Sequence, residues 1–154
     1  MLNHGTVEAI HVCTRRGAAP IEVQQVRAVA GKGLKGDRYF GRIKRGQPRP
    51  QDAATLIEAE AIESLADIGI MLEPGETRRN ITTRGVDLNA LVGQIFRVGE
   101  AVFEGYELCD PCVHLEKRTG KKIKAALENQ GGLRAWIIEG GSIAKGDSIE
   151  FDLS

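Results

Sequence analysis

The sequence lacks a long apolar run and lacks an excess of charge of either sign. No stretch approaches the roughly 18 apolar residues that a membrane-spanning helix needs. The amino terminus, MLNHGTVEAI, does not have the charged-then-apolar layout of a signal peptide. Lysine and arginine total 21, as do aspartate and glutamate, so no overall field draws the chain to nucleic acid or an anionic membrane. We therefore expect a cytoplasmic protein without nucleic-acid or membrane partners, in which any anion site is local.

Cysteine is scarce, and the number of cysteines is odd. The three thiols are Cys13, Cys109 and Cys112, a set that suits a reducing compartment better than a disulfide framework. A structural zinc ion usually needs four ligands. The CxxC segment offers only Cys109, Cys112 and His114, unless Cys13 or His11 arrives from far along the chain. This incomplete set disfavours zinc without excluding it.

The composition is that of an ordinary globular domain. Apolar residues make up 42% and charged residues 27% of the 154 positions, a balance that supports a packed core. The chain shows no internal repeat, low-complexity tract or linker. We expect a single domain over residues 1–154.

Short runs with β-like alternation occupy most of the chain and are separated by glycine-containing turns. The dipeptide Gly99-Glu100 is of a kind that joins two antiparallel strands into a hairpin. Seven or eight such strands predict a mainly β protein, a closed or nearly closed β-barrel with a few short flanking helices. An open α+β sandwich fits the same pattern. The expected strands are Thr6–Thr14, Ile21–Val29, Ala53–Ile57, Arg79–Thr83, Ile95–Val98, Ala101–Leu108, Leu133–Glu139 and Ser148–Leu153.

The remaining segments are predicted as helices or as a loop. Apolar residues at helical spacing predict an amphipathic helix over Glu58–Ile68, and Asn89–Leu91 reads as one helical turn. The pattern becomes helical again over Cys112–Glu128. Five glycines and two prolines make Gly31–Pro50 a long functional loop. Trp136 lies in an apolar run, so we expect it in the core.

The segment Leu108–His114 (LCDPCVH) joins a strand end to a predicted helix start. Unpaired backbone N–H groups and the helix dipole stabilise a thiolate at such a position, which favours metal binding or nucleophilic attack. Pro111 would sharpen the turn and present Cys112, with Cys109 as the second candidate and His114 as a neighbour that could tune it. Two alternatives stay open, a pair of small buried residues and a dithiol oxidoreductase, although the βαβ setting of the latter is missing.

Basic residues form a second group of candidates. Glycine N–H groups and guanidinium groups together can hold a phosphate, so this group predicts an anion pocket. The alternative is a set of solvated surface charges, and the glycines match neither a P-loop nor a dinucleotide fingerprint. The group comprises Lys32, Lys35 and Arg38 in the GKGLKGDR loop together with Arg78 and Arg79, which precede Asn80.

Read in order, a series of short motifs resembles the MOSC family, the domain named for the carboxy-terminal part of molybdenum cofactor sulfurases. Their order and spacing, rather than any single motif, make the resemblance specific, and it covers nearly the full length. The motifs are Gly33–Arg38, Arg79–Thr82, Gly85–Leu88, Leu91–Gly93, Phe96–Gly99, Cys109–Cys112, Gly132–Ala135, Gly140-Gly141 and Lys145–Asp147.

The resemblance implies a β-barrel that binds the molybdenum cofactor, a molybdopterin, with one cysteine that ligates the metal or carries sulfur. Cys112 matches that cysteine, and Cys109 is its less certain partner. A soft thiolate suits molybdenum or a persulfide, and the pterin phosphate needs basic donors. The cofactor contacts that the matching motifs imply are Lys35, Arg38, Arg79 and Asn80, whereas Asp37 would orient Arg38.

Two functions follow from the resemblance. In the first, the protein is a carrier that receives sulfur or cofactor on Cys112 from a donor protein and delivers it to molybdenum enzymes. In the second, it is a molybdenum-dependent reductase of N-hydroxylated substrates that works with a separate electron-transfer protein. Reduction of an N-hydroxylated base by cofactor-loaded protein and a chemical electron donor would distinguish the second from the first.

Overall fold

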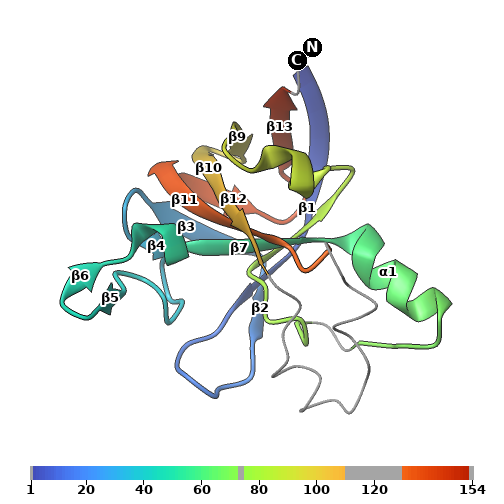
Figure 1. Cartoon of the computed structure of the whole chain (residues 1–154), viewed down its shortest axis with the longest axis horizontal. Helices are drawn as coiled ribbons and strands as arrows, with labels where there is room; N and C mark the ends of the chain where they lie inside the picture. The colour runs from blue at the N-terminus through green and yellow to red at the C-terminus, as the bar shows by residue number, and fades with distance from the viewer. Residues whose placement is uncertain (1, 73–74, 110–129, 153–154) are drawn as a thin grey trace.

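A computed structural model describes residues 2–72, 75–109 and 130–152 and confirms the mainly β prediction (Figure 1). One α-helix, α1 (Ala59–Asp67), and two 3-10 helices, η1 (Pro50–Asp52) and η2 (Leu88–Leu91), accompany the strands. The strands are β1 (Leu2–Val12), β2 (Ile21–Val23), β3 (Gln25–Val29), β4 (Gly33–Leu34), β5 (Ile43–Lys44), β6 (Gln47–Pro48), β7 (Ala54–Glu58), β8 (Ile81–Arg84), β9 (Ile95–Val98), β10 (Ala101–Leu108), β11 (Leu133–Glu139), β12 (Gly141–Ala144) and β13 (Ser148–Asp152).

Seven strands close into a barrel, in the order β13-β9-β10-β11-β7-β8-β1 with β1 pairing back to β13, and β2 adds to the outer side of β1. Closure satisfies the backbone hydrogen bonds that an open sheet would leave at its edges. All neighbours in the barrel are antiparallel except β7 and β8, which run parallel and have α1 in the connection between them. The closed barrel therefore replaces the open sandwich as the architecture.

Strand β1 closes the barrel because it pairs with a different strand along each part of its length. Leu2–Thr6 pairs with β13, Thr6–Ile10 with β8, and Ile10–Val12 with β2. A bulge between Val7 and Ala9 interrupts the pairing with β8, and bulges increase the local twist of a strand. The long strand thereby carries the chain from the end where the termini meet to the opposite end of the barrel (Figure 1).

Alternation along the strands fills the barrel interior with apolar side chains. The rings of Phe96 and Phe103 lie 5.7 Å apart inside it, and Phe103 is fully buried. On β11, Leu133, Ala135 and Ile137 point inward. The same alternation corrects the prediction for Trp136, which shares the outward face of β11 and is 37% exposed, with its ring edge-on to Tyr106.

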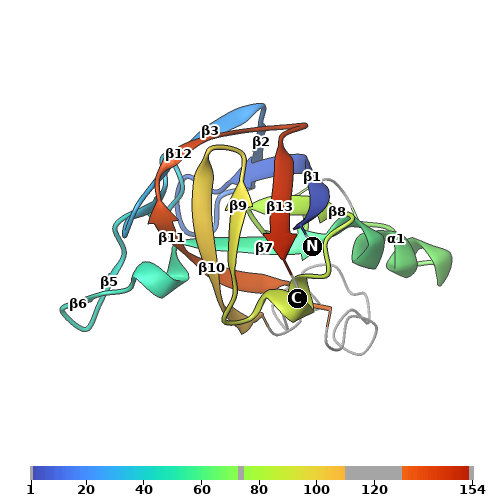
Figure 2. The same ribbon diagram turned by 90° about the horizontal axis from the view of Figure 1, so that it is seen from above.

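The sequence-based boundaries needed several changes. The predicted strand Ile21–Val29 divides into β2 and β3 at Gln24, whose carbonyl accepts a hydrogen bond from Lys145 N–H. The long loop Gly31–Pro50 contains β4 and the small hairpin of β5 and β6, which projects from the barrel on the side opposite α1 (Figure 2). Strand β12, which pairs with β3, was not expected. The predicted helix Cys112–Glu128 falls largely on residues 110–129, outside the described part.

The helices of the described residues are all too short or too polar to cross a membrane.

His11 is a buried polar side chain on β1. Its ring is 6% exposed, and neither ring nitrogen has a hydrogen-bond partner among the described residues. A Cβ atom placed on Gly75 would lie 2.7 Å from His11 Cδ2, which shows how closely that loop covers the ring. Burial lowers the pKa of His11, and Glu22 Oε1, at 3.8 Å from Nε2, opposes this shift only partly. The folded protein therefore favours the neutral form of His11 more than the unfolded chain does.

Phe103 lies inside the barrel and Trp136 lies on its outer face, so replacing them should lower the stability by different amounts. Phe103→Ala should lower the free energy of unfolding by about 3–5 kcal/mol, since it leaves a cavity in the core. Trp136→Ala removes a larger side chain that is partly in solvent, so about 1–2 kcal/mol is expected. Urea unfolding measures both values, and equal losses would contradict the outward placement of Trp136.

The lowered pKa of His11 predicts a pH-dependent stability. As the pH falls below about 6.5, the unfolded chain takes up a proton on this histidine more readily than the folded protein does, so folding is destabilised. His11→Leu should remove that part of the decrease in the free energy of unfolding between pH 7.5 and 5.5, measured with urea. The control His4→Leu alters an exposed residue and should keep the decrease. The same pH dependence in His11→Leu and wild type would refute the lowered pKa of His11.

Candidate functional site

A cavity of about 790 Å3 lies at the end of the barrel where the loop after β1 meets the loop after β4. Its described lining includes six arginines and a single carboxylate, so we call it the arginine cavity. The whole chain has no net charge, which makes this local excess of positive charge notable. The lining residues are Cys13, Arg16, Gly17, Asp37, Arg38, Tyr39, Arg42, Thr55, Thr77, Arg78, Arg79, Asn80 and Arg134.

The carboxylate of the cavity, Asp37, is buried and occupied by protein donors. It accepts hydrogen bonds from the backbone N–H of Cys13 at 2.9 Å and of Tyr39 at 3.3 Å, and from Nδ2 of Asn80 at 3.2 Å. It therefore holds the two loops together and supports Asn80, in place of the expected support for Arg38. Its negative charge lies at the wall of the cavity and balances only one of the guanidinium groups.

The side chain of Asn80 takes part in four hydrogen bonds of this wall. Its Oδ1 accepts from the N–H and Oγ1 of Thr55 on β7, at 3.1 and 3.2 Å. Its Nδ2 donates to the His11 carbonyl on β1 and to Asp37, at 3.1 and 3.2 Å. The side chain is 6% exposed, so removal of the amide would leave these groups without their partner in a largely buried place. Asn80 fixes three chain segments around the cavity, and its contact with a cofactor stays a prediction.

Two arginines frame an aromatic ring at the cavity. Arg38 Nη2 donates to the Tyr39 hydroxyl at 2.6 Å, and its guanidinium carbon lies 4.4 Å from the centre of the Tyr39 ring. The guanidinium carbon of Arg42 lies 4.7 Å from the same centre. Cation–π contacts of this kind position a guanidinium group without neutralising its charge. The pair is thereby held ready to bind an anion.

Arg79 is anchored to the start of β11. Its Nε donates to the Gly131 carbonyl at 2.8 Å. The neighbouring Gly132 has a φ of +112°, and a Cβ there would lie 2.2 Å from the Leu56 carbonyl oxygen. Glycine is therefore required for β11 to pass so close to β7. This close approach brings the Gly131 carbonyl within hydrogen-bond distance of Arg79 Nε.

Arg78 and Cys13 form a contact that the sequence did not suggest. Arg78 Nη2 donates to Cys13 Sγ at 3.2 Å and to the Ala18 carbonyl at 2.8 Å. Its backbone has a φ of +61°, a left-handed conformation that is uncommon for a residue other than glycine and that is found at functional sites. Nη1 of Arg78 is buried and has no hydrogen-bond partner among the described residues. A buried donor in this state favours the approach of an anion.

The structure brings together three of the predicted cofactor contacts, Arg38, Arg79 and Asn80. Lys35 is exposed and is not among the described lining residues of the cavity. Cys109 is buried just after β10, where its N–H donates to the Gly132 carbonyl at 2.8 Å. Cys112, the predicted metal ligand, lies outside the described residues.

Several lining residues escaped the sequence analysis, namely Cys13, Arg16, Arg42 and Arg134. Cys13 lies near the end of the predicted strand Thr6–Thr14, and Arg16 follows that strand, so a thiol and a basic residue close to a strand end were the available signal. Arg42 was inside the predicted functional loop. Arg134 lies on β11, and no sequence feature marked it as a site residue. It lines the cavity because the fold brings β11 next to segments that are distant in the sequence.

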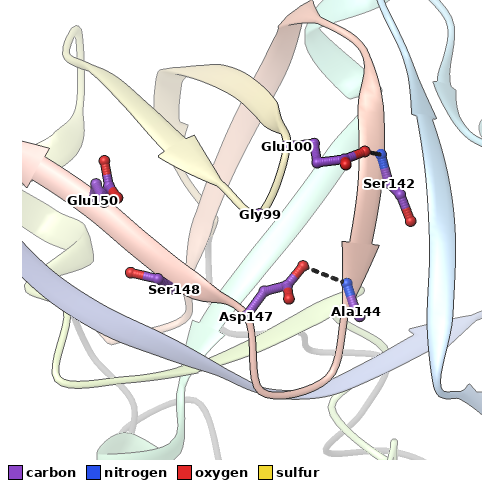
Figure 3. A pocket seen from close by; sticks show the side chains of 7 residues that line it. All are labelled: Gly99, Glu100, Ser142, Ala144, Asp147, Ser148 and Glu150. Atoms are coloured by element: carbon purple, nitrogen blue, oxygen red, sulfur yellow. Dashed lines mark hydrogen bonds between the residues drawn. The ribbon is translucent and has the colours of Figure 1, made fainter.

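A second pocket, at the turns beside β12 and β13, has an acidic lining (Figure 3). Glu100 Oε1 accepts from Ser142 N–H at 2.9 Å, and Asp147 Oδ2 accepts from Ala144 N–H at 2.8 Å. Asp147 thus stabilises its own turn between β12 and β13, whereas Glu100 joins the turn between β9 and β10 to β12. In the described part of the chain, no group of three or more His, Cys, Asp or Glu side chains is placed to hold a metal ion. The arginine cavity is therefore the candidate site.

Solved structures show the same fold with little sequence identity. YuaD from Bacillus subtilis superposes with a TM-score of 0.81 at 15% identity, over 97% of this chain and 96% of that one. YiiM from Geobacillus stearothermophilus gives a TM-score of 0.71 at 16% identity, over 96% and 75% of the two chains. YiiM from Escherichia coli gives 0.69 at 21% identity, over 96% and 69%. Identities this low show the fold alone.

Comparison with curated proteins gives no significant match. Comparison with protein families matches residues 32–150 to the MOSC domain. The matched range takes in the loop that contains Asp37, the segment with Arg78 to Asn80 and the Cys109–Cys112 motif. Because it spans most of the sequence and agrees with the closed barrel, the chain belongs to the MOSC family.

Proposed function

We propose that this protein binds the molybdenum cofactor through its phosphate in the arginine cavity and uses Cys112 to ligate molybdenum or to carry sulfur for delivery to molybdenum enzymes. The observation that carries the proposal is the set of six lining arginines beside one carboxylate that protein donors already occupy. The MOSC family is associated with this cofactor. An anionic, phosphorylated ligand fits the charge of the cavity.

The arginine side chains supply the chemistry that a phosphate needs. A guanidinium group presents a rigid fork of N–H donors that matches two phosphate oxygens, and such charge-assisted bonds are stronger than neutral ones. Arg38 and Arg79 are each anchored by a protein hydrogen bond, so less conformational entropy is lost when they bind an anion. The volume of about 790 Å3 is within the usual range for small-molecule sites.

The family match supports a role for Cys112, because residues 32–150 match the MOSC domain and include its motif. Cys109, the described residue closest to Cys112 in the sequence, is hydrogen-bonded to Gly132, next to the glycine whose carbonyl accepts from Arg79. That Cys112 acts at the arginine cavity is part of the proposal. When bound, the cofactor would supply the redox-active metal. A thiolate is a soft ligand for such a metal and can also hold sulfur as a persulfide.

Removal of the cavity charges should weaken cofactor binding. In protein made in a cofactor-producing host, Arg38→Gln and Arg79→Gln should each retain at least about tenfold less molybdenum and pterin after a high-salt wash, since each loses a charge-assisted phosphate contact. Arg97→Gln, at an exposed position on β9, is the matched control and should retain the wild-type amount. Wild-type retention in the Arg38→Gln, Arg79→Gln double variant would argue against the arginine cavity as the phosphate site.

The two thiols of the CxxC motif should differ in their effect. Serine keeps the size of cysteine but is a poor ligand for a soft metal and cannot form a persulfide. Cys112→Ser should therefore lose molybdenum or persulfide loading, whereas Cys109→Ser should keep most of it. Metal analysis and alkylation mass spectrometry measure the loading, and circular dichroism checks that both variants fold. Full loading of Cys112→Ser would refute its role, and loss in Cys109→Ser alone would transfer that role to Cys109.

A further inference from the structure

Cys13 is a thiol in the wall of a strongly cationic cavity. It is partly exposed, it lines the arginine cavity, and its sulfur accepts a hydrogen bond from Arg78 Nη2 at 3.2 Å. Its backbone N–H is fixed by Asp37 at 2.9 Å, so the residue has a defined position at the end of β1. The function proposed above uses Cys112 and leaves this second thiol without a role.

Two observations show that the surroundings of Cys13 favour an anion. The first is the set of six arginines in the lining. The second is Arg78 itself, whose Nη2 contacts the Cys13 sulfur while its buried Nη1 lacks a partner in the described part of the chain. A concave site lined by one sign of charge raises the local concentration of oppositely charged reagents and their association rate. An electrophile that carries carboxylates would thus be concentrated at the Cys13 sulfur.

We propose that Cys13 is a modification site for small disulfides that carry carboxylate groups, and that its modification closes the arginine cavity to other anions. In the exchange, the Cys13 sulfur, after loss of its proton to solvent, attacks one sulfur of the disulfide. A bond forms between Cys13 Sγ and that sulfur, the original S–S bond breaks, and the second sulfur leaves as a thiolate that takes a proton. Cys13 is oxidised by the disulfide, which is itself reduced, so no other oxidant is needed.

The consequence of the exchange is steric and electrostatic. The attached group occupies part of a cavity of about 790 Å3, and its carboxylates engage the guanidinium groups that would otherwise bind a phosphate. Reduction by a small thiol reverses the exchange and reopens the cavity. The oxidation state of Cys13 would thus control anion binding. The proposal needs only the thiol and the charges of the cavity, so it stands apart from the identity of the cofactor.

The test compares disulfides of different charge on the cofactor-free wild-type chain. Oxidised glutathione is the anionic reagent and bis(2-hydroxyethyl) disulfide the neutral one, and peptide mass spectrometry follows Cys13, Cys109 and Cys112 separately. The ratio of anionic to neutral rate constants at Cys13 is measured in the folded protein and in urea. We expect the ratio of anionic to neutral rate constants to be at least about tenfold higher in the folded protein than in urea. In 1 M salt the ratio of the folded protein should fall towards the value in urea, because salt screens the cavity charges. The salt test uses the wild-type chain, so it does not depend on any substitution.

Variants localise the effect. Arg78→Gln and Arg42→Gln should each lower the ratio, and Arg42 provides the second test because its guanidinium group lies over the Tyr39 ring, whereas Arg78 donates directly to the Cys13 sulfur. Arg97→Gln removes one exposed charge elsewhere and should leave the ratio unchanged. Equal ratios in folded and unfolded protein, or a ratio that resists both high salt and the two cavity variants, would overturn the proposal.

Binding of inorganic pyrophosphate tests the closing of the cavity. Calorimetry should show binding to the reduced protein, at least about tenfold weaker binding after Cys13 is modified with glutathione, and recovery after dithiothreitol. Cys13→Ser should bind pyrophosphate and show no response to oxidised glutathione. Pyrophosphate binding that persists when Cys13 is fully modified would overturn the closing role. No molybdenum or pterin takes part, so these results are separable from those on cofactor retention.

Discussion

The side-chain amide of Asn80 is the interaction on which the arrangement of the candidate site depends. It joins β1, β7 and the loop of Asp37 through four hydrogen bonds in a buried place. Asp37 in turn holds the backbone of Cys13 and Tyr39. Since a buried polar network is stable only when its members are satisfied, the loops cannot move separately without loss of these bonds. The arginine side chains are thereby attached to a rigid base.

That rigidity explains how a chain without net charge can keep so many guanidinium groups close together. Like charges repel, and the repulsion is weakened here by the cation–π contacts of Tyr39, by backbone carbonyl acceptors for Arg78 and Arg79, and by solvent at exposed Arg16. Arg134 differs from these arginines, since its Nε lies 3.6 Å from the carboxylate oxygen Oε1 of Glu107. The positive potential survives within the cavity, and the free energy of binding an anion includes relief of the repulsion.

The period-2 alternation was enough to predict most strands, because inward and outward positions follow directly from the pleat. It favoured a barrel but also fitted an open sandwich, since closure depends on the pairing of β1 with β13 at the two ends of the chain. Trp136 follows Arg134 by two residues, so the same period places both on the outward face of β11. The prediction that Trp136 lies in the core was wrong because it relied on the apolar residues around Trp136 and did not follow the alternation along the strand. Strand β12 was missed because a four-residue strand between glycines has too little pattern. The meeting of Cys13, Arg42 and Arg134 depends on contacts between distant segments, which no local motif encodes.

The pairing of Leu2 with Asp152 places the two ends of the described chain on neighbouring strands, at the opposite end of β1 from Cys13. A strand of this length spans roughly 30 Å. A reporter or affinity module fused at either end would therefore stand well away from the cavity. A short linker between the ends, with new termini opened in the β5–β6 hairpin, should likewise give a circularly permuted barrel with the cavity wall unbroken.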